Sequence, residues 1–125
     1  PMAHHFVVSI LLYLCEGASV LLAAGSLSQS VLDFAAREGP SVFYASPYHY
    51  RLLGKDPSQV GLGGVRLAVS TAEGLHPDVA RAFAARFGLH LVQALGIIEV
   101  GLPVLNLVSC AAKPAALGRP LASAA

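Results

Sequence analysis

Short apolar runs alternate with helical patterns along this chain. Four runs are apolar nearly throughout and have the length of strands that are covered on both faces; they span residues 20–23, 42–45, 65–69 and 91–94. Helical patterns lie between them, and such alternation is typical of parallel strands joined by crossover helices. The pattern predicts an α/β fold class, with a mainly parallel sheet and helices on both faces.

Two of the intervening helices have recognisable ends. One is predicted over residues 77–87, because Pro77 suits the first helical position and Gly88 lies just beyond the last. The other is expected to begin at Ser28, as its N-cap, and to run to about Glu38. In the helix over 77–87 the apolar residues recur at four-residue spacing, so we expect them in the core: Val79, Phe83 and Phe87.

Residues 55–64 are polar and then glycine-rich, which predicts a surface connection. The glycines at 61, 63 and 64 do not form a phosphate-binding loop, because no Lys and Ser/Thr follow them and they lead into a strand. A chain of 125 residues is long enough for one domain. Both ends of the sequence read as internal cuts, so residues 1–125 are expected to form a single partial domain.

The composition is unusually apolar. Hydrophobic residues make up 55% of the chain and charged residues 12%, against roughly a quarter charged in an average soluble domain. Such a chain is expected to pack against the remainder of a larger protein, or to self-associate through the cut apolar face. A membrane span is not predicted, because the apolar run over residues 6–15 is shorter than the about 20 residues that a spanning helix needs.

The charge and the cysteines indicate which binding partners and which cellular compartment to expect. The formal net charge is +1 and the eight Lys and Arg residues are scattered, so there is no basic stripe for a nucleic-acid backbone. Cys15 and Cys110 show no CxxC spacing, which indicates neither a disulfide framework nor a zinc site. A reducing, cytoplasmic setting is expected.

The stretch over residues 91–101 is the first candidate for chemistry. It reads as a buried strand that runs straight into a loop, which exposes one acid, Glu99, near a glycine, Gly101. An acid at the carboxyl end of a strand is where a nucleotide or a metal could be held. The spacing alone is not specific, and a plain strand end with a solvated Glu99 remains the alternative.

Five motifs, in order, carry a resemblance to a known family. They are PMAHHF at residues 1–6, SPYHYRLL at 46–53, RLAVSTAEGL at 66–75, ALGIIE at 94–99 and LGRPL at 117–121. The chain resembles the middle of the large N-terminal domain of adenylate-forming enzymes: acyl- and aryl-CoA ligases, luciferases and the adenylation domains of peptide synthetases. The family forms of these motifs are PLFHNF, VPTxYRxLL, RLxVSAGEAL, GYGxTE and SVGRPLPG, the third being typical of benzoate-type CoA ligases.

The resemblance implies a flavodoxin-like subdomain of an acid-thiol ligase. The parent enzyme would activate a small carboxylic acid with ATP and Mg²⁺ to an acyl-adenylate. It would then pass the acyl group to the thiol of coenzyme A, or of a carrier-protein phosphopantetheine. The resemblance of the loop at residues 72–74 favours an aryl or short branched acid as the substrate.

The resemblance also implies site residues. Glu99 would bind Mg²⁺, a task suited to a carboxylate oxygen. The nucleotide would lie against Ala72, Glu73, Gly74, Gln93, Ala94, Leu95, Gly96 and Ile98. The acyl group would be surrounded by His4, Tyr48, Ser70, Leu95 and Ile97. A helix-capping role for His4 and plain packing for Tyr48 remain alternatives.

Two departures from the family put ATP use in doubt. The Thr that precedes the acid in the family is Ile98 here, which has no hydroxyl for the α-phosphate, and the aromatic beside the adenine is Leu95. The sequence also lacks three features of the family. They are the Ser/Thr/Gly-rich loop ending in Lys that holds the β- and γ-phosphates, the later Asp that binds the ribose, and the C-terminal domain with its catalytic Lys. No catalytic set is complete, so this chain alone is expected to be inactive. The alternative is a non-catalytic acyl-binding or protein-interaction module.

Overall fold

The computed structural model describes residues 7–25, 27–97 and 101–121. Their elements in chain order are η1 (Val7–Leu11), α2 (Leu12–Cys15), α3 (Ser28–Glu38), β1 (Val42–Ala45), α4 (Pro47–Lys55), β2 (Leu67–Ser70), α5 (Pro77–Phe87), β3 (Leu91–Ile97), β4 (Gly101–Leu105) and β5 (Arg119–Pro120). The strands form one five-stranded sheet in the order β1-β2-β3-β4-β5.

The sheet is mixed. β1, β2 and β3 are parallel neighbours, whereas β3 pairs with β4 and β4 with β5 in antiparallel fashion. Only residues 98–100 separate β3 from β4, too few for the crossover that a parallel pair needs. The predicted α/β class is confirmed, and its parallel part is β1-β2-β3.

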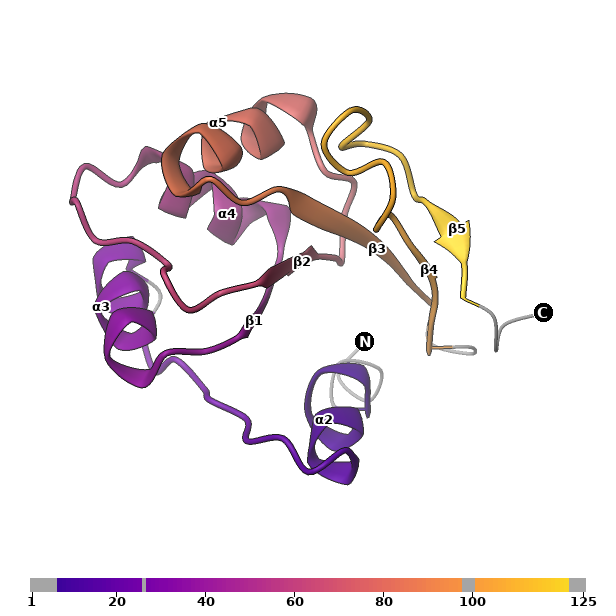
Figure 1. The fold of residues 1–125 in the computed structure, drawn as a ribbon, viewed down its shortest axis with the longest axis horizontal. Coiled ribbons are helices and arrows are strands. Elements are labelled where there is room, and N and C mark those ends of the chain that lie inside the picture. Colours follow the sequence, from indigo (N-terminus) through magenta and orange to yellow (C-terminus); the bar gives the residue numbers. More distant parts are fainter. Residues whose placement is uncertain (1–6, 26, 98–100, 122–125) are drawn as a thin grey trace.

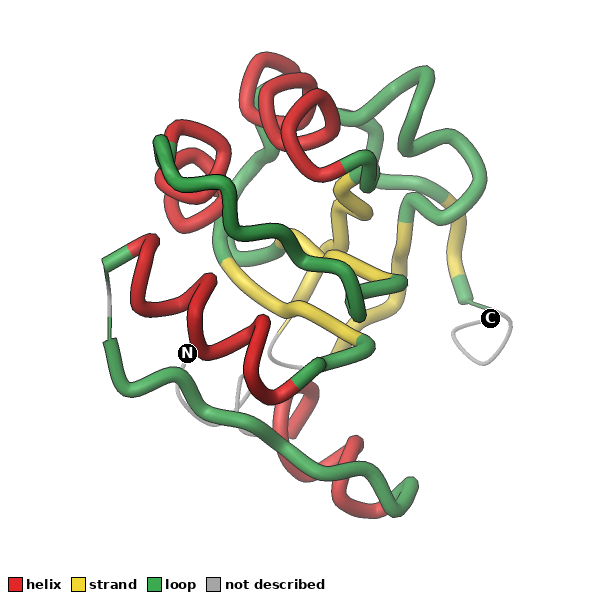
Figure 2. Tube along the Cα trace, turned by 60° about the vertical axis from the view of Figure 1, so that its left-hand side comes forward, coloured by secondary structure: helices red, strands yellow, loops and turns green. Residues whose placement is uncertain are grey.

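Helices lie on both sides of the sheet. In Figures 1 and 2, α4 and α5 lie above the strands and α2 lies below them. On the upper side the core forms around Tyr50 and Phe83, both fully buried, with ring centroids 5.0 Å apart. The Tyr50 hydroxyl oxygen lies 3.0 Å from the Phe43 carbonyl oxygen and 2.9 Å from that of Val69. The buried hydroxyl therefore donates to a carbonyl oxygen of β1 and to one of β2.

The two helices predicted from the sequence are present. α5 has the predicted bounds, and Val79 and Phe83 are buried as expected. α3 also matches, but the capping role of Ser28 is wrong. Leu27 is the N-cap, and Ser28 makes no capping bond because its hydroxyl donates to the Asp56 carboxylate instead.

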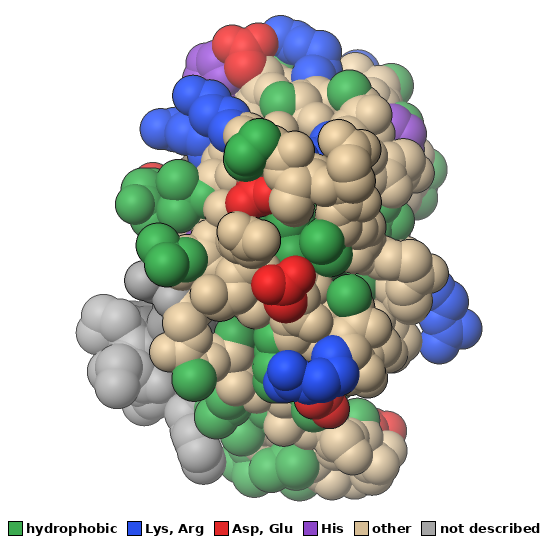
Figure 3. All heavy atoms as spheres, turned by 90° about the vertical axis from the view of Figure 1, so that its left-hand side faces the viewer, with side chains coloured by type: hydrophobic (Ala, Val, Ile, Leu, Met, Phe, Trp, Pro, Cys, Tyr) green, Lys and Arg blue, Asp and Glu red, His purple; other side chains and the backbone are tan. Residues whose placement is uncertain are grey.

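The predicted strand over residues 20–23 is wrong. The segment is not a strand, since it pairs with no other strand in the described ranges. It belongs to the extended connection from α2 to α3, which Figure 2 shows running along the outside of the molecule. Leu21 and Leu22 are exposed. Figure 3 looks at the left-hand side of Figure 1, and its lower end, where α2 and this connection lie, is rich in hydrophobic side chains.

Other boundaries differ locally from the prediction. β2 begins at Leu67 rather than at Val65, because the Val65 amide donates back to Leu62 in a turn. The predicted surface connection over 55–64 contains the end of α4, and it buries Asp56 and Leu62. Within the described ranges, we find no helix with the length and apolar character needed to cross a membrane.

Candidate functional site at the carboxyl ends of the parallel strands

The carboxyl ends of β1, β2 and β3 meet at one edge of the sheet, because these strands are parallel. We call this the carboxyl edge and define it by residues 46–48, 70–74 and 93–97. Ligands of open α/β sheets bind at such an edge. It contains most of the site residues predicted from the sequence. Those that lie outside the described residues are His4, Ile98 and Glu99.

The loop after β2 presents an exposed turn between two buried anchors. Ala72, Glu73 and Gly74 are exposed, whereas the flanking Thr71 and Leu75 are buried. The Thr71 amide donates to the Ala45 carbonyl oxygen over 3.2 Å. Nothing lies within 4 Å of the position that a Cβ of Gly74 would take. The loop therefore offers its backbone to a ligand.

β3 becomes more exposed toward the carboxyl edge. Gln93 and Ala94 are buried, Leu95 is half-buried, and Gly96 and Ile97 are exposed. The pairing with β4 is irregular between Leu95 and Ile97, and such an irregularity bends the strand locally. The β3 residues predicted to contact the nucleotide, 93–96, thus run from the core to the surface within one strand.

The Gln93 side chain links β3 to the loop after β2. Its Oε1 accepts a hydrogen bond from the Leu75 amide over 2.7 Å. Ser70 and Gln93 are register partners of the parallel β2-β3 pair. The link therefore ties the end of the loop, at Leu75, to the strand beside β2. Sequence reasoning did not find it, because the two partners are 18 residues apart.

The side chains predicted to surround the acyl group differ in exposure. Tyr48, in the first turn of α4, is 56% exposed and its ring lies edge-on to that of His49. Ser70 is fully buried, and its hydroxyl has no hydrogen-bond partner in the part of the chain that the structure describes. Ile97 is 38% exposed. Tyr48 and Ile97 are thus accessible to a ligand, whereas Ser70 lies beneath the edge.

A mostly apolar cavity of about 400 Å³ lies beside the carboxyl edge. Ser46, Thr71 and Ala72 line it from the edge, His49 lines it from α4, and Val31 lines it from α3. The Ser46 hydroxyl and His49 Nδ1 lie 2.9 Å apart. The start of α4 was missed in the sequence, although Ser46 followed by Pro47 is a helix-start signal.

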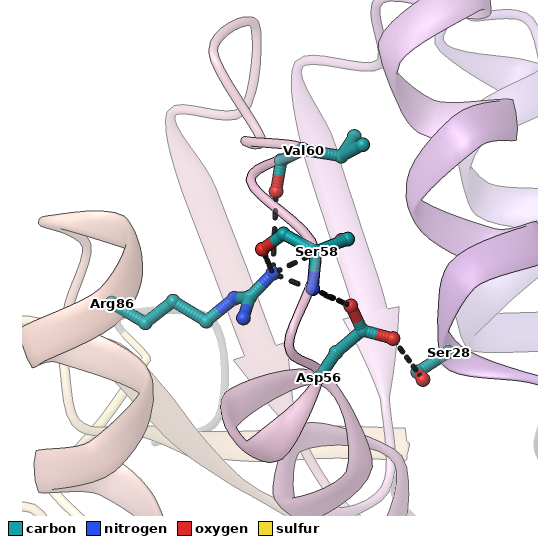
Figure 4. Close-up of polar contacts among 5 residues, drawn as sticks. All are labelled: Ser28, Asp56, Ser58, Val60 and Arg86. Carbon is teal, nitrogen blue, oxygen red and sulfur yellow. Dashed lines mark hydrogen bonds and ion pairs between the residues drawn. The ribbon is translucent and has the colours of Figure 1, made fainter.

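A largely buried ionic cluster joins three helices (Figure 4), and its Ser28 also lines the cavity beside the carboxyl edge. Asp56, just after α4, accepts hydrogen bonds from the Ser28 hydroxyl and from the Ser58 amide. These bonds, more than the charge of Arg86, lower the pKa of Asp56 to about 2. The cluster is structural. Its sequence signal is Asp56 two residues before Ser58, which is typical of an Asx turn.

The predicted magnesium ligand lies outside the described residues. Across 7–25, 27–97 and 101–121, no three His, Cys, Asp or Glu side chains gather in a way that could hold a metal ion. The predicted ligand, Glu99, is the second residue after β3 in the sequence. The turn at 72–74, by contrast, is described and exposed, so it is accessible to a flat ligand such as a nucleobase.

Two curated relatives are CoA ligases. The chain is 29% identical to the sulfoacetate–CoA ligase of Cupriavidus necator over 108 residues, which are 85% of this chain and 21% of that protein. It is 32% identical to the benzoate–CoA ligase of Thauera aromatica over 90 residues, which are 70% of this chain and 17% of that protein. The chain thus spans about a fifth of the length of these relatives.

Solved structures have the same fold. The anthranilate CoA ligase AuaEII, in complex with anthranoyl-AMP, superposes on 85% of this chain with a TM-score of 0.75 and 29% identity, over 21% of its own length. ATP-bound MatB from Rhodopseudomonas palustris superposes on 94% of this chain with a TM-score of 0.80 and 24% identity, over 24% of its own length. The family model of AMP-binding enzymes matches residues 1–125, the whole chain. The chain therefore belongs to the AMP-binding enzyme family of adenylate-forming proteins.

Proposed function

We propose that the intact protein is an acid-thiol ligase, which activates a small carboxylic acid with ATP and transfers the acyl group to a thiol. One observation carries the proposal. In a chain that matches the AMP-binding family from end to end, the exposed loop 72–74 and the exposed end of β3 lie at one edge of the parallel strands. That edge is where an α/β sheet binds nucleotides.

Two sets of residues would share the site. The nucleotide would lie against the loop Ala72-Glu73-Gly74 and against β3 from Gln93 to Gly96, with Ile98 beside the α-phosphate. The acyl group would lie among Tyr48, Leu95 and Ile97, with His4 near its carboxylate and Ser70 beneath it. Glu99 would hold Mg²⁺, which, when bound, neutralises charge on the phosphates.

The proposed reaction has two steps. A carboxylate oxygen of the acid attacks the α-phosphorus of ATP, so that the acyl-adenylate forms and pyrophosphate leaves. The thiol of coenzyme A or of a carrier-protein phosphopantetheine, as its thiolate, then attacks the acyl carbon, and AMP leaves. Because no side chain forms a bond to the substrate, catalysis rests on positioning and on stabilising the charge at phosphorus.

The substrate class is proposed to be a small aryl or short branched acid. Two of the accessible side chains at the carboxyl edge, those of Tyr48 and Ile97, are an aromatic ring and a branched aliphatic chain. They would bury the apolar part of such an acid. The relatives named for benzoate and for anthranilate are consistent with this class, and the relative named for sulfoacetate defines the competing class of small polar acids.

The proposal is tested by pyrophosphate exchange in the intact protein, with benzoate, anthranilate, sulfoacetate and short branched acids. We expect exchange that depends on the acid and is fastest for an aryl or branched acid. Glu99→Ala should nearly abolish it, whereas Glu38→Ala, a change at an exposed acid in α3, should leave it unchanged. Exchange with none of the acids would contradict the proposal.

A second candidate is a non-catalytic module that binds an acyl group or a protein. It is favoured by Ile98, which replaces the family Thr and removes a hydrogen bond worth about 1–3 kcal/mol if the phosphate oxygen stays unpaired. The gene distinguishes the two functions, since an intact phosphate loop upstream and a catalytic Lys downstream favour the enzyme. Calorimetry that detects acid binding in a protein without pyrophosphate exchange would favour the module.

A further inference from the structure

The loop at 72–74 has an unfavourable backbone conformation at its first residue. Ala72 has a φ of +79° and is the only non-glycine residue with a positive φ in the described parts of the chain. A residue with a Cβ adopts this left-handed region only when its surroundings enforce it. The adjacent side chains of Ala72 and Glu73 are exposed, so the constraint comes from the two ends of the loop.

Each end of the loop is fixed by one buried hydrogen bond. At the start, the Thr71 amide donates to the carbonyl oxygen of Ala45 in β1. At the end, the Leu75 amide donates to Gln93 Oε1 over 2.7 Å. Thr71 and Leu75 are each 3% exposed and Gln93 is 4% exposed. The first bond is made by two backbone groups, whereas the second depends on one side chain.

The Gln93 carboxamide oxygen is thus already used within the protein. It lies opposite the end of β2 in the sheet register, next to the point where the loop returns to the core. A ligand at the carboxyl edge would meet the backbone of this strand, but it would not meet the buried Oε1. The side chain therefore acts on a ligand through the loop that it holds.

We propose that Gln93 is a positioning residue. Its Oε1 fixes the return of the chain at Leu75 and thereby keeps the loop 72–74 in the exposed, left-handed conformation that meets the nucleotide. The role in nucleotide binding rests on the function proposed above, whereas the hold on the loop does not. Without the acceptor, the buried Leu75 amide has no partner, Ala72 is free to relax, and the loop loses its shape for the nucleotide.

The test compares two substitutions at this position in the intact protein. Gln93→Met keeps the length of the side chain and removes the oxygen, whereas Gln93→Glu keeps an acceptor oxygen. We expect the Met variant to exchange the amide hydrogens of residues 72–75 about tenfold faster and to raise KM for ATP about tenfold, with kcat little changed at saturating ATP. The Glu variant should stay close to wild type in both measurements.

Asn106→Leu is the matched control. Asn106 is a second buried amide, whose Nδ2 donates to the Lys113 carbonyl oxygen and whose Oδ1 accepts from the Ser109 hydroxyl. It fixes the loop after β4 in the same manner. Its loss should speed amide exchange in residues 106–113 but leave KM for ATP unchanged.

Amide exchange and KM for ATP together distinguish a failure of the Gln93 proposal from a failure of the proposed adenylation. A folded Gln93→Met variant with wild-type exchange at 72–75 would overturn the proposal, as would faster exchange there with no change in KM for ATP. A wild-type protein without adenylation would remove the proposed function, and the hold on the loop would then be decided by exchange alone. If the Met variant does not fold, wild-type exchange decides: a Leu75 amide as fast as that of exposed Gly74 overturns the proposal, and a protected one supports it.

Discussion

Asp56 Oδ1 lies 3.6 Å from Arg86 Nη2, and this pair joins the end of α4 to the last turn of α5. Both side chains are largely buried, at 5% exposed for Asp56 and 18% for Arg86. Nη2 of Arg86 also donates to the Ser58 carbonyl oxygen over 2.8 Å. A buried carboxylate that accepts several hydrogen bonds is stabilised in its charged form.

The first prediction concerns the pH dependence of stability. The pKa of Asp56 is lowered from 3.8 to about 2 by hydrogen bonds from Ser28 and Ser58. A lowered carboxylate pKa contributes stability that is present above pH 3.8 and is lost as the pH falls toward 2. Asp56→Asn should therefore destabilise the protein at pH 6, and the difference from wild type should shrink below pH 3.

Urea unfolding of the intact protein at several pH values measures this difference. Asp33→Asn is the control, because Asp33 is an exposed acid on α3; its difference from wild type should stay small throughout. A difference for Asp56→Asn that is the same at pH 6 and below pH 3 would show that the charge of the carboxylate is not what stabilises the cluster.

The second prediction concerns Gly118, just before β5. Its φ is +96°, and a Cβ at this position would lie 2.1 Å from the Leu105 carbonyl oxygen. Gly118→Ala must therefore push the chain away from β4 and break the pairing of Leu105 with Arg119. Gly39→Ala isolates the backbone effect, since Gly39 has a φ of +61° with open space around it. We expect about 1–2 kcal/mol for Gly39→Ala and a clearly larger loss for Gly118→Ala.

Unfolding in urea compares the two variants. Amide exchange at Arg119 and Leu121 reports on β5, since Pro120 has no amide hydrogen. Equal losses of unfolding free energy in both would mean that the close approach to Leu105 has no energetic consequence. Faster exchange at Arg119 and Leu121 should be confined to Gly118→Ala.

The sequence predicts those elements of the fold whose signals lie within one short segment of the chain. α5 and β1 have the predicted bounds because their signals are local: a helix-start Pro77, a helix-end Gly88, and an apolar run of strand length. Residues 20–23 have the same local signal as β1, yet they form no strand, because a strand also requires a paired neighbour. β4 was missed for the converse reason, since β3 supplies the pairing and Pro103 weakens the local signal.

The candidate site was likewise predictable only in part. The family motifs and the parallel order of the strands brought loop 72–74 and the end of β3 to one edge, and the structure has both at that edge. The bond from Leu75 to Gln93 and the bond from Ser28 to Asp56 join residues 18 and 28 positions apart. No periodicity or motif within one segment encodes such pairs, so they required the structure.

The third prediction is that this 125-residue chain, expressed by itself, self-associates. Leu12 and Leu14 of α2 and Leu22 in the connection that follows it are 53%, 52% and 71% exposed, and the lower end of the molecule in Figure 3 is rich in hydrophobic side chains. Contiguous apolar surface beyond a few hundred Å² is rare on monomers. Light scattering should show oligomers that grow with concentration, and Leu14→Lys with Leu22→Lys should reduce them. A monomer at high concentration that binds no hydrophobic dye would contradict the prediction.

The last prediction concerns Ile98 and rests on the proposed adenylation. In the intact protein Ile98→Thr would return a hydroxyl to the position beside the α-phosphate and leave Glu99 in place for Mg²⁺. We expect acyl-adenylate formation to rise about tenfold, for about 1.4 kcal/mol gained in the transition state. Ile98→Val is the matched control, because it has the branched shape of Thr without the hydroxyl and should not raise the rate. Single-turnover measurement of the acyl-adenylate checks this. Equal rates for Thr and Val would show that no phosphate oxygen lies within reach of residue 98, and the nucleotide would then have to be placed elsewhere along the carboxyl edge.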